Sequence, residues 1–259
     1  MRRWLISVLI LLLPPDSPAD AAADKGLALF IAADQRDRGW VDGRADLEMV
    51  LRNQQGEESR RRLRIDTLEV AGDGDKSLTV FDAPRDIKGT AFLSYTHALA
   101  PDDQWLYLPA LQRVKRIASA NKSGPFVGSE FAYEDITSQE VEKYTYKWLR
   151  DDRLQERAVF VVEAYPAYEN SGYTREIIWL DQEMYQPLRV EYFDRKNAPL
   201  KTLEFSGHQQ FLGRYWRPGH MLMQNQQTGK STELVWSNYR FKTGLDAGDF
   251  DQNTLKRAR

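Results

Sequence analysis

The chain has 259 residues, of which 36 are Lys or Arg and 38 are Asp or Glu, and it contains no cysteine. The near balance of charge argues against a nucleic-acid partner. The lack of cysteine excludes disulfide bonds, thiol catalysis, thiolate metal sites and a lipid anchor attached through cysteine.

The N-terminus has the organisation of a secretory signal peptide. Arg2 and Arg3 precede an apolar run, Trp4 to Leu13, which is followed by prolines and then by small residues. The run is about half of the roughly 20 residues that span a bilayer. We therefore expect residues 1–23 to be a cleaved signal peptide. Residues 24–259 would then form a single exported domain that is not inserted in a membrane.

The first element of the mature chain is expected to be a helix over residues 24–38. Leu27, Phe30 and Ile31 fall at helical spacing, and no proline interrupts the segment. Gly39 suits the position just after a helix end. Such an amphipathic helix must bury its apolar stripe, and we expect it to pack on a sheet.

From Gly43 onward the pattern is almost entirely that of β-strands. Segments of strand length are separated by turn residues, among them Gly72-Asp73-Gly74 and Asp151-Asp152. Because parallel strands need long crossovers, closely spaced strands predict antiparallel hairpins. The expected strands are residues 43–52, 60–70, 77–82, 91–95, 105–108, 113–118, 141–149, 158–165, 174–180, 187–193, 200–205, 215–224 and 231–241, followed by a polar tail around Phe250 and Leu255.

A sheet of ten or more strands tends to curl. It could close into a barrel, split into a sandwich, or stay open around a helix. Residues 159–165 and 177–180 are apolar on both strand faces and therefore need cover on both sides. This pattern favours an α+β fold that is mainly β with few helices, in which helical segments or a ligand cover an open sheet.

Residues 102–136 combine two short strands with a long connection. Turn-forming residues fill positions 119–129, and residues 130–136 could make one or two helical turns after Ser129 as N-cap. This connection carries four apolar or aromatic side chains, which either close a core or cover something that is not protein. They are Phe126, Val127, Phe131 and Tyr133.

Two motifs in this stretch carry a family resemblance. The run W-L-Y-L-P-A-L-Q-R-V-K-R-I at residues 105–117 precedes the loop G-P-F-x-G-S-x-F-x-Y-E-D at residues 124–135. The chain resembles the outer-membrane lipoprotein-sorting protein family from about Ala22 to about Leu255. The resemblance implies a periplasmic protein with the fold of the carriers LolA and LolB. That fold is an unclosed antiparallel barrel with a helical lid over an apolar cavity that holds acyl chains.

No set of residues assembles a catalytic or metal site. His208 and His220, with Glu204, could approach one another on neighbouring strands, but their spacing matches no dedicated metal motif. Adjacent carboxylates such as Asp102-Asp103 point to opposite strand faces, and Ser129 does not lie in a G-x-S-x-G elbow. We expect no metal and no cofactor, and a binding protein rather than an enzyme.

The chain has 7 Trp, 12 Tyr and 11 Phe. The core of a large β-protein accounts for much of this number, and an apolar cavity would explain the rest. We expect an adaptable lining that includes methionines. The candidate lining and lid residues are Leu47, Met49, Leu51, Phe92, Trp105, Tyr107, Phe126, Val127, Phe131, Tyr133, Trp179, Tyr192, Phe205, Met221 and Met223. Arg113, Lys115 and Arg116 are candidates for a rim that meets a lipid head group or a partner's acidic residue, or they form a solvated strand face.

These features, with the resemblance, predict a monomeric periplasmic carrier. It would bind the acyl chains of lipoproteins or free lipids and pass them from an inner-membrane transporter towards the outer membrane. Two alternatives stay open. One is an accessory protein of an inner-membrane lipid exporter, and the other is a β-rich envelope scaffold that binds no ligand.

Overall fold

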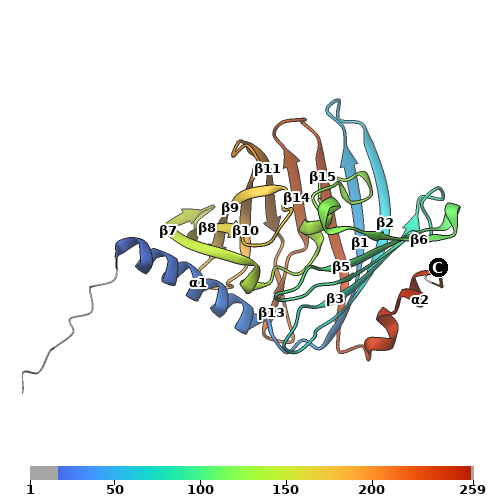
Figure 1. Cartoon of the computed structure of the whole chain (residues 1–259), viewed down its shortest axis with the longest axis horizontal. Helices are drawn as coiled ribbons and strands as arrows, with labels where there is room; N and C mark the ends of the chain where they lie inside the picture. Colours follow the sequence, from blue (N-terminus) through green and yellow to red (C-terminus); the bar gives the residue numbers. More distant parts are fainter. Residues whose placement is uncertain (1–16, 258–259) are drawn as a thin grey trace, which may run out of the picture.

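The computed structural model describes residues 17–257 and contains one dominant antiparallel sheet. Its thirteen strands follow the order β6-β5-β4-β3-β2-β1-β15-β14-β11-β10-β9-β8-β7. The edge strands β6 and β7 end this order, so the curved sheet is not closed into a barrel (Figure 1). The strands of the sheet are β1 Asp42–Arg52, β2 Glu58–Leu68, β3 Lys76–Ala83, β4 Ala91–Tyr95, β5 Asp103–Leu108, β6 Arg113–Ile117, β7 Tyr144–Leu154, β8 Arg157–Pro166, β9 Tyr173–Asp181, β10 Pro187–Asp194, β11 Pro199–Ser206, β14 His220–Asn225 and β15 Ser231–Phe241.

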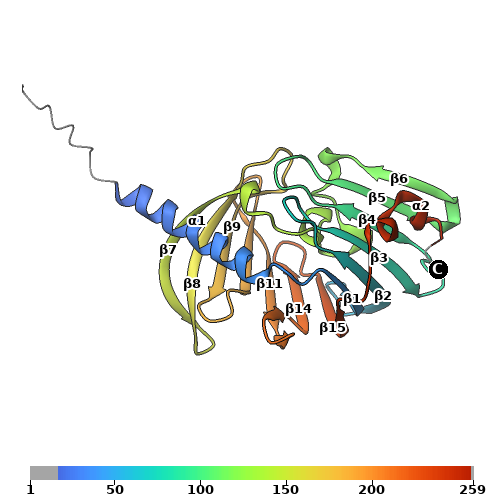
Figure 2. The ribbon, with the colours of Figure 1, turned by 90° about the horizontal axis from the view of Figure 1, so that it is seen from below.

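The two α-helices of the described chain lie towards opposite ends of this sheet (Figure 2). Helix α1 (Pro18–Asp37) packs on β7, whereas α2 (Gln252–Leu255) packs on β4 and β5. The face that carries α1 and residues 119–143 is called the inner face below, and the opposite face the outer face. Within residues 17–257, neither helix is long and apolar enough to cross a membrane. The mainly β, open fold expected from the sequence is confirmed.

Helix α1 begins earlier than expected, and of the three residues expected to be buried only Phe30 is. Ser17 caps it by accepting a hydrogen bond from the backbone N–H of Asp20, whose carboxylate accepts one back. The buried residues are Gly26, Leu29 and Phe30. The expected burial of Leu27 and Ile31 is wrong, since these side chains are 41% and 39% exposed. The expected signal-peptide features at residues 2–15 lie outside the described part of the chain.

Close contact with the β7 backbone explains which stripe of α1 is buried. A Cβ atom on Gly26 would lie 2.8 Å from the backbone nitrogen of Trp148. Only glycine allows the helix to approach the strand this closely, so the face with Gly26 turns inward. A glycine carries no hydrophobic side chain, so the hydrophobic periodicity could not show that Gly26 is on the buried face. The periodicity therefore predicted burial of Leu27 and Ile31 instead.

The expected turn at Asp151-Asp152 is also wrong, because β7 continues to Leu154. A register shift between Trp148 and Arg150 absorbs one residue, and the strand then resumes its pairing with β8. The hairpin turns at Gln155-Glu156, where both residues have positive φ (49° and 68°), as a two-residue turn with a right-handed twist requires.

Three other expectations need correction. Residues 141–143 form a short 3₁₀ turn before β7 rather than the start of the strand. The expected strand over residues 215–224 is two strands, β13 (Tyr215–Arg217) and β14, and β13 pairs with β12 (Gln209–Phe211) in a separate hairpin. Of residues 130–136, only Tyr133–Ile136 form a helical turn, which is 3₁₀.

The tail expected to be polar closes a second core on the outer face. Phe250 and Leu255 are fully buried, together with Leu245, against Leu93 and Trp105. The Tyr95 hydroxyl donates to the backbone carbonyl of Phe250. The strands β3 to β5 are therefore apolar on both faces because residues 245–255 cover one face and the segment 119–143 covers the other.

Candidate ligand cavity

Residues 119–143, called the plug segment below, cross the inner face of the sheet. Phe126 and Phe131 are 2% and 1% exposed, and both belong to the inner core. The Phe126 ring packs edge-on against Phe92, with centroids 5.2 Å apart, and against Tyr133, with centroids 5.6 Å apart. Their burial results from this aromatic cluster, which joins the plug segment to β4.

Hydrogen bonds attach the plug segment to strands that are distant in sequence. Arg61 on β2 donates to the carbonyl of Val127 over 2.6 Å, and Gln104 on β5 donates to that of Tyr133 over 3.1 Å. The backbone N–H of Glu130 donates to Thr232 on β15 over 2.9 Å. The plug segment is thus tied to both halves of the sheet.

The strongest tie is a buried ion pair between Lys201 on β11 and Asp135. The Lys201 Nζ lies 2.6 Å from the Asp135 carboxylate, and the two side chains are 4% and 1% exposed. Asp135 also accepts hydrogen bonds from the Tyr173 hydroxyl and the Ala132 N–H, each at 2.6 Å. Lys201 donates a further bond to the Glu130 carbonyl at 3.0 Å. Both buried charges are therefore paired and hydrogen-bonded, as burial requires.

A small polar cavity of about 70 Å³ lies behind this ion pair. Glu176, which is 5% exposed, borders it, and burial raises the pKa of this carboxyl to about 8. The carboxylates of Asp135 and Glu134 raise that pKa further, while Lys201 and a hydrogen bond from Tyr144 lower it. Glu176 is therefore mostly protonated at neutral pH, as a carboxyl in a low-dielectric site should be.

An apolar cavity of about 400 Å³ lies between the plug segment and the strands β1, β2, β3, β14 and β15. This volume falls within the usual range of small-molecule sites, about 300–1,000 Å³. Six of the residues proposed from the sequence border it: Leu47, Met49, Phe126, Phe131, Phe205 and Met221. Residues that sequence reasoning missed also border it, including Trp40, Ala45, Leu63, Ile65, Ile136, Leu234, Trp236, Tyr239 and Phe241.

The other proposed lining residues lie elsewhere. Leu51, Phe92, Val127, Tyr133 and Met223 belong to the inner core without bordering the apolar cavity, and Tyr192 borders the small polar cavity. Trp105 and Tyr107 lie on the outer face with the tail. Trp179 packs beside the Arg189 guanidinium, which is 5.7 Å from the ring centroid.

The proposed rim residues lie on the edge strand β6. Arg113, Lys115 and Arg116 are exposed and do not border the apolar cavity. Arg116 forms an ion pair with Asp103 across the β5–β6 hairpin. Within residues 17–257, no group of three or more His, Asp or Glu side chains is placed to hold a metal ion, and His220 bonds Glu233 instead.

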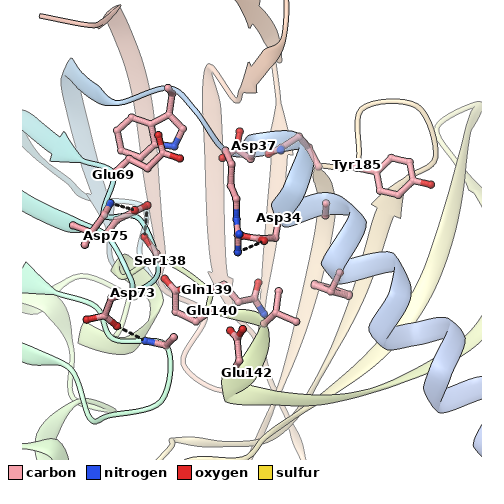
Figure 3. Close-up of a pocket in the computed structure, with 18 of the residues that line it drawn as sticks. Asp34, Asp37, Glu69, Asp73, Asp75, Ser138, Gln139, Glu140, Glu142 and Tyr185 are labelled. Atoms are coloured by element: carbon pink, nitrogen blue, oxygen red, sulfur yellow. Dashed lines mark hydrogen bonds and ion pairs between the residues drawn. The ribbon is translucent and has the colours of Figure 1, made fainter.

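A second cavity of about 640 Å³, called the acidic cavity below, adjoins the apolar one (Figure 3). It lies between the C-terminal end of α1, the β2–β3 connection and residues 138–142. The two cavities share five lining residues: Asp37, Trp40, Asp75, Ser138 and Gln186. Seven carboxylates line the acidic cavity: Asp34, Asp37, Glu69, Asp73, Asp75, Glu140 and Glu142.

The carboxylates of the acidic cavity differ in their protonation. Burial raises the pKa of Asp75 to about 6, although the Val70 N–H and the Ser138 hydroxyl donate to it. Burial, and then the charge of Asp75, raise the pKa of Glu140 to about 7. In contrast, a hydrogen bond from His97 lowers the pKa of Asp73 to about 2. Burial is thus the main cause of both raised pKa values, and the charges of neighbouring carboxylates add to it.

Comparison with solved structures identifies the family. An outer membrane lipoprotein-sorting protein domain from Vibrio parahaemolyticus is 56% identical, with a TM-score of 0.89 over 91% of this chain and 100% of that chain. The chain belongs to the outer-membrane lipoprotein-sorting protein family. This chain is also similar to a DUF1329 family protein from Desulfovibrio piger, with 28% identity and a TM-score of 0.85 over 90% of this chain and 99% of that chain.

The LolA-like fold is supported by a more distant structure. A LolA superfamily protein from Nitrosomonas europaea is 18% identical, with a TM-score of 0.71 over 88% of this chain and 98% of that chain. A family model described as an uncharacterized protein matches residues 73–257. No curated protein sequence is significantly similar to the chain. The resemblance stated from residues 105–135 is confirmed at the level of family and fold.

Proposed function

We propose that this protein is a periplasmic carrier that holds acyl chains of lipoproteins or free lipids in the apolar cavity and delivers them towards the outer membrane. The observation that carries the proposal is the apolar cavity between the plug segment and the inner face of the sheet. The similar Vibrio parahaemolyticus structure is described as an outer membrane lipoprotein-sorting protein domain, which supports the same role. The proposed role involves no covalent chemistry and no cofactor.

The binding energy would come from burial of methylene groups. Each buried methylene contributes about 0.8 kcal/mol, so a chain of about fifteen carbons would gain roughly 12 kcal/mol before ordering costs. Met49 and Met221 border the cavity, and their flexible side chains can adapt to different chains. The aliphatic, aromatic and methionine side chains of this cavity would provide the adaptable apolar lining that an acyl ligand needs.

We further propose that the protein acts as a monomer after removal of residues 1–23. That cleavage leaves Gly26, Leu29 and Phe30, the residues with which α1 contacts the sheet. An inner-membrane transporter is the proposed donor of the cargo.

The test is binding of a fluorescent fatty-acid probe by detergent-free protein. Ala45 borders the cavity and is 7% exposed, so Ala45→Phe should fill it and weaken probe binding by at least tenfold. Val235 is 37% exposed on β15 and does not border the cavity, so Val235→Phe serves as the control and should bind normally. Wild-type protein that fails to bind the probe saturably would refute the proposed function.

A further inference from the structure

Two neighbouring turns and an edge strand form one corner of the sheet, called the basic corner below. It consists of residues 84–90, which are the β3–β4 turn, and residues 109–117, which contain the β5–β6 turn and β6. Because β4 pairs with β5, the two turns lie side by side, and a Cβ atom on Gly89 would lie 3.4 Å from the Pro109 side chain. Figure 1 shows both turns beside β6 at the right of the view.

Positive charge is concentrated on the basic corner. It contains five basic residues and one acidic residue, Asp86, whereas the whole chain has a net charge of -2. One of the five, Arg116, forms an ion pair with Asp103 on β5. The side chains of the other four are exposed and form no ion pair or hydrogen bond within residues 17–257: Arg85, Lys88, Arg113 and Lys115. The basic corner therefore presents four unpaired cations to solvent.

Protection of the sheet edge explains only part of this charge. β6 is an edge strand, and lysine or arginine on such a strand prevents pairing with another chain. This accounts for Arg113 and Lys115, whereas Arg85 and Lys88 belong to a turn and have no strand edge to protect. None of the four borders the apolar cavity or the acidic cavity, so these cations are not part of the proposed cargo site.

An exposed apolar side chain lies among the cations. Leu111, in the β5–β6 turn, is 68% exposed and precedes Arg113 by two positions. Surfaces that bind lipid bilayers combine basic side chains, which meet anionic head groups, with apolar side chains that enter the boundary between head groups and acyl chains. A soluble acidic partner would account for the cations but not for the exposed leucine.

We propose that the basic corner docks the protein on a membrane surface that contains anionic lipid. The contact is peripheral and is made by the side chains of two turns and one strand. Each Lys or Arg near an anionic surface strengthens such binding about fivefold. The proposal goes beyond the proposed function and does not depend on it, because the corner carries its charge whether or not the apolar cavity holds a ligand.

Flotation with lipid vesicles tests this docking. Detergent-free protein is mixed with vesicles of phosphatidylcholine alone, or with vesicles in which about one lipid in three is phosphatidylglycerol. The partition coefficient for the anionic vesicles should exceed that for the neutral vesicles at least about twentyfold at low salt. Most of this preference should disappear at about 1 M salt, where the screening length falls to about 3 Å. Equal binding to the two kinds of vesicle would overturn the proposal. Binding to soluble polyglutamate but not to vesicles would also overturn it, and would assign the corner to an acidic protein partner.

Two pairs of substitutions locate the binding surface. Arg113→Gln with Lys115→Gln removes two of the four cations and should lower the partition coefficient for the anionic vesicles about 25-fold, as two factors of about five. Arg85→Gln with Lys88→Gln should have an effect of similar size, and this pair leaves the edge strand unaltered. Binding of the fluorescent fatty-acid probe, measured on the same samples, should be normal, which shows that the variants are folded and separates docking from the proposed function.

The control removes the same amount of charge from other parts of the surface. Lys147→Gln with Lys230→Gln replaces two exposed cations, one on β7 and one in the β14–β15 turn, and should bind vesicles as the wild type does. If this pair loses as much binding as the corner variants, the interaction depends on total charge rather than on the basic corner, and the proposal is wrong.

Discussion

The substitution Asp135→Asn tests whether the buried ion pair holds the plug segment in place. It removes the negative charge that compensates the Lys201 ammonium, which is 4% exposed, and leaves that ammonium with neutral acceptors such as the Glu130 carbonyl. Removing one partner of a buried ion pair typically costs about 3–5 kcal/mol, since the remaining charge is buried and uncompensated. This is a large share of the roughly 5–15 kcal/mol by which domains are stable.

Urea unfolding followed by tryptophan fluorescence measures this cost. The control is Glu48→Gln, which breaks the 2.9 Å pair with Arg60, whose side chains are 42% and 58% exposed. Exposed pairs contribute about 0–1 kcal/mol, so the control should lose little. Amide hydrogen exchange should also show that residues 126–135 are protected in the wild type and exchange faster in Asp135→Asn. If both variants lose less than about 1 kcal/mol, the ion pair does not hold the plug segment.

Two further substitutions address buried polar groups. Burial raises the pKa of Glu176 from its ordinary value of 4.5 to about 8, so the folded chain retains a proton that the unfolded chain loses. Stability should therefore fall as pH rises from about 4.5 to about 8. Glu176→Gln should make the urea midpoint nearly independent of pH over this range, and the variant should be more stable than the wild type at pH 9. A variant whose urea midpoint falls with pH as steeply as that of the wild type would contradict the raised pKa of Glu176. Tyr146→Phe removes an unpartnered hydroxyl and should stabilise the ligand-free protein by about 1 kcal/mol in the same assay, whereas a loss of stability would reveal a partner for that hydroxyl.

Local patterns in the sequence were enough to predict most of the sheet. Alternation of side chains placed β4 at Ala91–Tyr95 and β15 at Ser231–Phe241, as the structure has them. The turn at Asp151-Asp152 was wrong because a bulge in β7 cannot be read from alternation. Sequence patterns therefore predict strands well and predict register irregularities poorly.

The inward face of each strand was harder to predict. Trp105 and Tyr107 were proposed as lining, but they pack with residues 245–255 on the outer face. Both faces of β5 are apolar, so its alternation contains no sign of which face looks inward. The deciding fact is that the C-terminal tail folds back on the sheet, and no local pattern shows this.

The polar features of the site depend on distant residues. Asp135 and Lys201 are 66 positions apart, and each looks like an ordinary surface charge in the sequence. The carboxylates of the acidic cavity are dispersed over residues 34–142, where none forms a recognisable motif. Only the fold brings these groups together.

Native mass spectrometry of the protein, purified from its native host without detergent, would show whether the apolar cavity carries a ligand. A carrier should show a discrete added mass that solvent extraction resolves into acyl-containing species, and the polar groups of these species would distinguish a lipoprotein from a free lipid. A ligand-free mass, from protein that also does not bind an added acyl probe, would refute the carrier function and favour an envelope scaffold that binds no ligand.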